Sequence, residues 1–168
     1  MFLLRDIPPR YTLDKLAQRY SELDPSALMC LIMLLRTGSD LSVIFDKILS
    51  RYGLSQGRFL TLIVLNRNPN EEITPSELSD KVGVTRATMT GLLTNLSKDG
   101  LVDLVQHKED RRKFIVQLTS TGRKILDEIL PGYYREISIL VADLKEDERE
   151  QFINFLVRIG TAVQNFKR

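Results

Sequence analysis

Residues 84–96 read Val84-Thr85-Arg86-Ala87-Thr88-Met89-Thr90-Gly91-Leu92-Leu93-Thr94-Asn95-Leu96. Four apolar residues in this stretch follow the spacing i, i+3, i+4 and i+7, which is typical of the buried face of a helix; they are Met89, Leu92, Leu93 and Leu96. The opposite face carries Arg86, Thr90 and Thr94, which are four residues apart and therefore form one row. Short hydroxyl side chains beside a single cation allow a second surface to approach closely. We therefore expect this face to lie against another molecule.

The residues before this helix predict another helix and a tight turn. Thr74-Pro75-Ser76-Glu77 is a capping-box sequence with proline at the first helical position. Gly83 offers the left-handed residue that ends a helix, and Thr85 is the expected N-cap of the next one. Two helices joined by a glycine-containing turn form a helix-turn-helix, whose second helix can enter the major groove of DNA.

The residues after the helix predict a β-hairpin. Two β-rich runs, residues 101–106 and 113–118, are joined by the charged segment 107–112. Gly100 ends the helix just before the first run, and Ile73 is expected to add a short strand beside the hairpin. A helix-turn-helix followed by such a hairpin is a winged helix, with residues 107–112 as the tip of the wing.

Several short motifs in this region occur together and in order. They are Thr74-Pro-Ser-Glu-Leu-Ser, Val84-Thr-Arg-Ala-Thr-Met-Thr, Leu93-Thr-Asn-Leu-Ser-Lys-Asp-Gly-Leu-Val, Asp110-Arg-Arg and Leu118-Thr-Ser-Thr-Gly. With these motifs the chain resembles the MarR family of bacterial transcriptional regulators, most strongly over residues 54–122. The Leu130-Pro131 step and the long helix expected after it are similar to the multidrug-efflux repressors of that family.

The resemblance implies a homodimer that binds double-stranded DNA and is often released by small anionic or phenolic molecules or by oxidants. It implies no metal and no cofactor. The residues expected to contact DNA lie in the helix-turn-helix and the wing: Thr74, Ser76, Thr85, Arg86, Thr88, Thr90, Thr94, Lys108, Asp110, Arg111 and Arg112. In the family pattern Asp110 orients an arginine, so Arg112 is expected in the minor groove and Arg111 at a phosphate. A narrow minor groove concentrates negative potential, which independently favours an arginine there.

The expected fold is mainly α with a small β-hairpin wing. We expect an N-terminal arm with dimerisation and linking helices in residues 1–53, the winged helix in 54–118, and C-terminal dimerisation helices in 119–168. The run 27–35 is apolar nearly all round and needs surrounding protein, and a long apolar stripe follows residue 150. The residues expected at the dimer interface are therefore Leu28, Leu31, Ile32, Phe152, Phe155, Leu156, Ile159 and Val163. Breaks or kinks are expected at Thr37-Gly38-Ser39 and at Pro131-Gly132.

Composition agrees with an intracellular globular protein. The chain has 168 residues, 43% hydrophobic residues and a net charge of +2, so its net charge alone says little about nucleic acid. A single cysteine excludes an intramolecular disulfide and suits a reducing compartment. The apolar run 27–35 is about half the ~20 residues needed to span a bilayer. We therefore expect a cytoplasmic protein that is not inserted in a membrane.

Several residues have two interpretations. Cys30 is either an oxidant sensor or an inert core residue, and its apolar neighbours favour the inert role because a reactive thiolate needs a cationic setting. His107 is either a phosphate contact or a solvated loop residue. Tyr133 and Tyr134 are either effector-pocket or interface aromatics. An effector cleft is expected where the interface helices meet the winged helix, near Phe45, Tyr52 and Phe59.

Three classes of function explain these features to different degrees. A ligand-responsive transcriptional regulator, most simply a repressor, accounts for the helix-turn-helix, the wing and the terminal helices together. The alternatives are a winged helix used for protein–protein contact, and a regulator that senses oxidants through Cys30. An enzyme is not expected, because the chain has no nucleophile–base set and no phosphate-binding glycine loop, and its one histidine lies in the hairpin tip.

Overall fold

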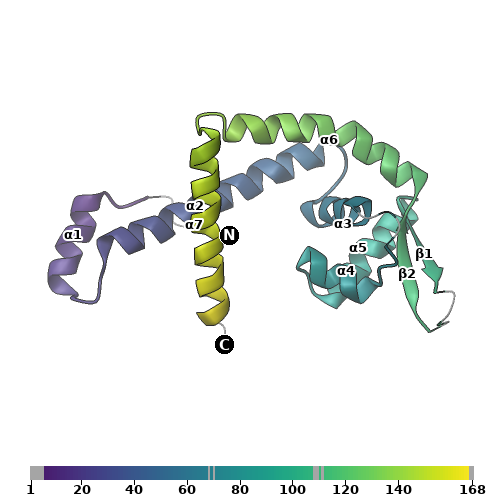
Figure 1. Cartoon of the computed structure of the whole chain (residues 1–168), viewed down its shortest axis with the longest axis horizontal. Coiled ribbons are helices and arrows are strands. Elements are labelled where there is room, and N and C mark those ends of the chain that lie inside the picture. The colour runs from purple at the N-terminus through teal and green to yellow at the C-terminus, as the bar shows by residue number, and fades with distance from the viewer. Residues whose placement is uncertain (1–5, 68, 70, 108–109, 111, 167–168) are drawn as a thin grey trace.

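The structure is a computed structural model that describes residues 6–67, 69, 71–107, 110 and 112–166. Its helices and strands follow one another along the chain as α1 (Arg10–Arg19), α2 (Pro25–Ser50), α3 (Gln56–Arg67), α4 (Pro75–Val82), α5 (Arg86–Lys98), β1 (Val102–Gln106), β2 (Phe114–Leu118), α6 (Ser120–Leu140) and α7 (Glu146–Phe166). The expected class, mainly α with one β-hairpin, is confirmed (Figure 1).

One hydrophobic core lies inside the winged helix. It gathers buried side chains from every element between α3 and the first half of α6, among them Phe59, Leu62, Leu78, Met89, Leu93, Leu96, Val102, Val116, Leu126 and Ile129. The predicted inner face of α5 is confirmed, because Met89, Leu93 and Leu96 are buried and Leu92 packs against the same core. The winged helix therefore has its own core, independent of α7.

The predicted hairpin is formed, and Ile73 adds the expected third short partner. β1 and β2 are antiparallel, with Val102 opposite Leu118 and Gln106 opposite Phe114. Ile73 forms a single bridge to Val116, where the Val116 N–H donates to the Ile73 carbonyl at 2.8 Å. Gly100, with φ of 69°, ends α5 and turns the chain into β1 as expected.

Two helices are longer than the sequence suggested. α2 runs without interruption through Gly38, so the predicted break at Thr37-Gly38-Ser39 is wrong. A single glycine lowers helix stability by only about 1 kcal/mol, too little to stop a helix of 26 residues. α6 likewise continues through Pro131, which is exposed, and Figure 1 shows the helix changing direction without a break. The missing proline N–H is thus accommodated on the solvent side.

The terminal helices extend away from the winged helix. In Figure 1, α2 runs from the winged helix to α1 at the other end of the molecule, and α6 runs from the winged helix to α7, which crosses α2 in this view. α7 contains no buried residue within the single chain. Among the described residues, α2 is the one helix long and apolar enough to cross a membrane by length and composition alone, which is weak evidence because core helices pass the same test.

The first turn of α6 packs directly on the turn that precedes β1. Gly122 is buried there, and a Cβ atom at this position would lie 2.2 Å from the Leu101 carbonyl oxygen and 2.7 Å from Leu118 Cδ1. The carbonyl belongs to the backbone and cannot rotate away. Only glycine fits at this contact.

We therefore expect Gly122→Ala to destabilise the protein by about 3 kcal/mol, the upper end of the usual effect of overpacking. Gly91→Ala is the matched control, because nothing lies within 4 Å of its Cβ position and alanine stabilises a helix interior by about 0.5–1 kcal/mol. Urea unfolding at one fixed protein concentration measures both. Equal stability of the two variants would contradict the close packing of α6 on Leu101.

Candidate nucleic-acid interface

The capping box at the start of α4 is formed as predicted. The Thr74 hydroxyl accepts from the Glu77 N–H at 3.3 Å, and the Glu77 carboxylate accepts from the Thr74 N–H at 2.8 Å. The bond from the Thr74 amide, followed by that from the Thr74 hydroxyl, holds the pKa of Glu77 below its usual range. Ser76 lies in the same first turn, where its carbonyl accepts from the Ser79 hydroxyl. These hydrogen bonds fix the N-terminus of α4.

The turn between the helices is also as predicted. Gly83 has φ of 78° and ends α4, and the Thr85 hydroxyl accepts from the Thr88 N–H at 3.1 Å to begin α5. The hydroxyls of Thr85 and Thr88 lie 2.8 Å apart and share a further hydrogen bond. Both threonines are exposed at the N-terminus of the helix, where the unpaired N–H groups and the helix dipole favour an anion.

The outer face of α5 is exposed and lined by short side chains. Arg86, Thr90 and Thr94 are all exposed. The Thr90 hydroxyl donates to the Arg86 carbonyl at 3.0 Å, and the Thr94 hydroxyl donates to the Thr90 carbonyl at 2.9 Å. With these protons directed at the backbone, the oxygen lone pairs of both threonines point outward as acceptors, beside the guanidinium donor of Arg86. The row therefore offers both donors and acceptors to a bound surface.

The wing carries an exposed arginine at its tip. The Arg112 side chain is exposed, and its backbone N–H donates to Asp110 Oδ1 at 3.1 Å. Asp110 also lies 3.8 Å from the Lys113 ammonium. The Asp110 carboxylate thus fixes the backbone of Arg112 and does not contact its guanidinium through this hydrogen bond. Lys108 and Arg111 lie outside the described residues.

His107 is not the solvated loop residue that one interpretation proposed. Its Nε2 lies 3.2 Å from a Glu72 carboxylate oxygen, and its Nδ1 accepts from the Asp110 N–H at 3.1 Å. The ring is about one quarter exposed, since the side chain retains 23% of its accessible surface. His107 belongs to the internal structure of the wing.

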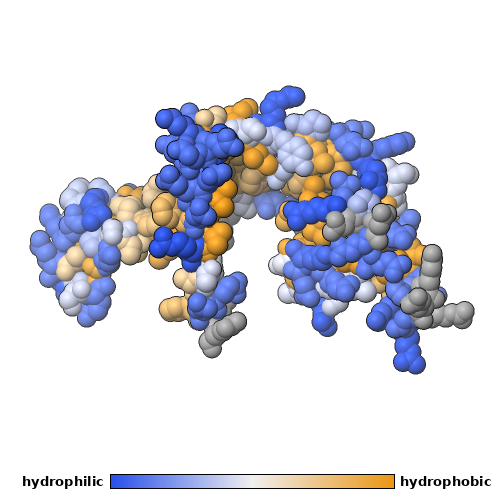
Figure 2. Space-filling view, in the orientation of Figure 1, coloured by the Kyte–Doolittle hydropathy of each residue, from blue (hydrophilic) through white to orange (hydrophobic). Residues whose placement is uncertain are grey.

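Four of the predicted interface residues, all in α7, line an apolar groove, whereas Leu28, Leu31, Ile32 and Val163 do not line it. The groove measures about 840 Å³ and lies between α2 and α7, with Phe152, Phe155, Leu156 and Ile159 on one side and Met33, Leu34 and Leu41 on the other. Figure 2 shows apolar side chains next to the hydrophilic outer side of α7. Leu31 and Phe155 are about half exposed in the single chain, whereas Ile32 is already buried. Most of this apolar surface is therefore uncovered.

Cys30 is exposed and lines the same groove, so the expectation that it packs in the core is wrong for the single chain. The reason is that this part of α2 has no helix of the same chain tightly packed on every side. The groove also includes Arg158. Among the described residues, no cluster of three or more histidine, cysteine, aspartate or glutamate side chains could hold a metal ion.

Comparison with known proteins agrees with this geometry. The model of the MarR family matches residues 52–113. The Bacillus subtilis HTH-type transcriptional repressor YetL is 29% identical over 164 residues, covering 98% of both chains. The uncharacterized B. subtilis HTH-type transcriptional regulator YdgJ is 30% identical over 115 residues, covering 68% of this chain and 69% of its own.

The chain belongs to the MarR family. The Mycobacterium tuberculosis transcriptional regulator MOSR, solved in complex with DNA, superposes with a TM-score of 0.65 at 26% identity, covering 81% of this chain and 96% of its own. As a member of this family the protein is a DNA-binding transcriptional regulator with repressors among its relatives. The family is not an enzyme family.

The effector cleft expected for a MarR protein is only partly compatible with the structure. Phe59 is 2% exposed and belongs to the core, so it offers no surface to a ligand. Tyr133 covers it, with ring centroids 4.8 Å apart, and also contacts Phe45 at 5.9 Å. Burial, followed by the neighbouring Tyr134, raises the pKa of Tyr133. Tyr52 and Tyr134 are exposed beside this aromatic cluster.

Two interactions within the MarR winged helix were not predicted from the sequence motifs. Arg58 at the start of α3 forms an ion pair with Asp99, the C-cap of α5, and so ties the two helices together. The other is the approach of Glu72 to His107. A signal for it was present, because the predicted strand at Ile73 places its neighbour Glu72 beside the wing.

Proposed function

We propose that this MarR-family protein is a repressor that binds a near-palindromic operator as a homodimer and is released by a small anionic or phenolic molecule. The observation that carries the proposal is the uncovered apolar surface on α2 and α7 beside a winged helix that already has its own core. Exposed apolar surface of this kind is typical of a region that a partner subunit covers. The domain boundaries proposed are 1–53, 54–118 and 119–168.

The proposed DNA contacts divide by their chemistry. The row of Arg86, Thr90 and Thr94 faces base edges in the major groove, where guanidinium and hydroxyl groups can read donors and acceptors. The hydroxyl residues near the helix N-termini, Thr74, Ser76, Thr85 and Thr88, suit phosphates. In the wing, Asp110 places Arg112 at the minor groove, and Lys108 and Arg111 contact the backbone of the duplex.

The proposed effector site lies beside Phe45 and Tyr52, where α2 and α6 meet the winged helix. Phe59 is proposed to respond to the effector through Tyr133 and not to touch it, because it is buried beneath that ring. A ligand that displaced Tyr133 would disturb the core against which α5 packs. The proposed compartment is the cytoplasm, where the DNA is.

Oxidant sensing through Cys30 is a second candidate function. It is favoured by one observation, the exposure of Cys30 in a groove that includes Arg158. In the proposed dimer this groove is covered by apolar surface, which disfavours a thiolate. We therefore keep the ligand-released repressor as the first proposal.

The first test concerns the wing. Arg112→Ala should weaken operator binding and reduce the dependence of log K on log salt by about 1 for each DNA charge that is no longer neutralised. The operator can be found by sequencing the genomic DNA that the purified protein retains. Arg10→Ala is the matched control, because it removes the same charge from α1 at the opposite end of the molecule. Unchanged affinity and salt dependence in Arg112→Ala would remove this residue from the interface.

The second test concerns the dimer. Phe155→Glu and Ile159→Glu, singly and together, place charges on the groove side of α7 and should convert dimers to monomers in sedimentation and lower operator binding at least tenfold. Val157→Glu adds the same charge to an exposed apolar position of α7 that does not line the groove, so it should remain dimeric. The proposal fails if the wild-type protein is a monomer that binds a half-site as tightly as the full operator.

The third test separates the two candidate modes of release. Mild peroxide should change operator binding by Cys30→Ser to the same extent as binding by the wild type, because in our proposal this thiol is not the sensor. Gel shifts before and after peroxide treatment measure it. If peroxide releases the wild type while Cys30→Ser stays bound, the oxidant-sensing function replaces release by a small molecule.

A further inference from the structure

A series of polar contacts joins the loop before α4 to the tip of the wing. The Glu72 carboxylate lies 3.2 Å from His107 Nε2. His107 Nδ1 accepts from the Asp110 N–H at 3.1 Å, and Asp110 Oδ1 accepts from the Arg112 N–H at 3.1 Å. These contacts lead step by step from the body of the winged helix to the arginine proposed for the minor groove.

The contacts of His107 define which of its nitrogens carries the proton. Nδ1 faces an N–H donor, so it must present a lone pair. The proton of the neutral ring is therefore on Nε2, which lies 3.2 Å from the Glu72 carboxylate. The imidazole thus lies between two groups, accepting a hydrogen bond from the turn of the wing on one side and facing a carboxylate of the body on the other.

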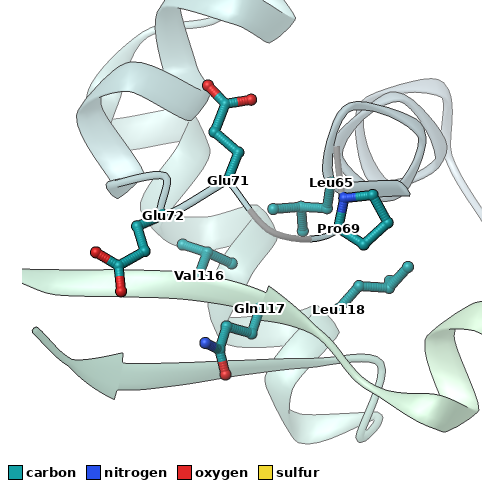
Figure 3. A pocket seen from close by; sticks show the side chains of 7 residues that line it. All are labelled: Leu65, Pro69, Glu71, Glu72, Val116, Gln117 and Leu118. Atoms are coloured by element: carbon teal, nitrogen blue, oxygen red, sulfur yellow. The ribbon is translucent and has the colours of Figure 1, made fainter. Parts of the chain in front are cut away.

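Glu72 is a firm attachment point for this link. The next residue, Ile73, is buried and bridged to Val116 of β2, and Thr74 after it is the N-cap of α4. Figure 3 shows Glu72 over β2, beside a hollow of about 230 Å³ that is also lined by Val116 and Gln117. The backbone of Glu72 therefore holds a defined position relative to the helix-turn-helix, and from there its half-exposed side chain reaches His107.

We infer that Glu72 and His107 are positioning residues, which hold the wing tip at the height and angle at which Arg112 meets DNA. The inference rests on the proposed role of Arg112. Without the link, the hairpin would still be restrained where Ile73 pairs with Val116 and where its strands pack on the helices, but the tip would lack the contact between His107 and Glu72. The tip would then have to be ordered when DNA binds, which lowers affinity.

The charge of Glu72 provides an unusual test of this role. A carboxylate near DNA repels phosphates, so removing one that has no other function strengthens binding. Removing a positioning carboxylate has the opposite effect, because its contact with His107 of the wing disappears with it. The sign of the change in affinity therefore distinguishes the two.

We expect Glu72→Ala to weaken operator binding about three- to tenfold, the effect of one polar contact at a partly exposed site. Glu72→Gln keeps an oxygen that can face His107 Nε2 while it removes the negative charge, so it should bind at least as tightly as the wild type. Thermal unfolding of both variants checks that the fold is intact. If Glu72→Ala binds as tightly as the wild type or more tightly, the inference is overturned.

His107→Asn tests the other half of the link. The asparagine Oδ1 can replace Nδ1 as acceptor for the Asp110 N–H, but the shorter side chain has no group at the position of Nε2. His107→Asn should therefore weaken binding as Glu72→Ala does, and the double variant should be no weaker than either single variant. Additive effects would show that the two residues act separately and would overturn the link.

A measurement without DNA tests the same link directly. The chain has one histidine, so the imidazole nitrogen signals of the untagged, ¹⁵N-labelled protein belong to His107. At mildly alkaline pH the wild type and Glu72→Gln should show the proton on Nε2, and Glu72→Ala should show a mixture of tautomers. A wild-type ring protonated on Nδ1 would overturn the inference.

The wild type and Arg112→Ala serve as references in the same titrations. If Arg112→Ala binds like the wild type, the proposed role of Arg112 has failed, and the imidazole signals still report whether the link exists. If Arg112→Ala is weakened and Glu72→Ala is not, the proposed function stands and this inference alone is wrong.

Discussion

Met89, Leu93 and Leu96 pack one face of α5 into the core of the winged helix, and this packing decides which side chains of α5 remain outside. Burial of three such side chains stabilises the helix by about 5–9 kcal/mol. The threonines and Gly91 in the same helix oppose helix formation by about 3 kcal/mol in total. Packing therefore outweighs poor helix propensity. The packing allows α5 to carry the short side chains Thr90 and Thr94 on its outer face, although such residues would leave an isolated helix unstable.

The local elements could be predicted from the sequence because their causes are local. A capping box at Thr74, a left-handed glycine at Gly83 and an N-cap at Thr85 each involve residues within a single turn. The hairpin followed from two β-rich runs of equal length. Gly38 did not interrupt its helix, because its local cost is overridden by the long helix that contains it. At Pro131 the predicted break is absent, and the helix changes direction instead.

In the candidate site, too, features with local causes could be predicted and contacts between distant segments could not. The outer face of α5 could be predicted, because a helix that buries one known face must expose the other. Phe59 was wrongly expected to face a ligand, because the sequence does not reveal that Tyr133, far along the chain, covers it. Cys30 was expected to be buried because its neighbours along the chain are apolar, but neighbours along α2 do not cover one another. Contacts between distant segments were the part that the sequence could not provide.

The uninterrupted course of α6 has a consequence for how this protein can evolve. α6 begins at Ser120, directly after β2, and reaches Leu140 as one helix, about 30 Å long at 1.5 Å per residue. Inserting or deleting a single residue would turn everything beyond it by about 100° around the helix axis. α7 would then present a different side to a partner while the wing stayed in place. The number of residues in α6 thus determines which side of α7 faces a partner. We expect substitutions along α6 to be tolerated more readily than changes in its length.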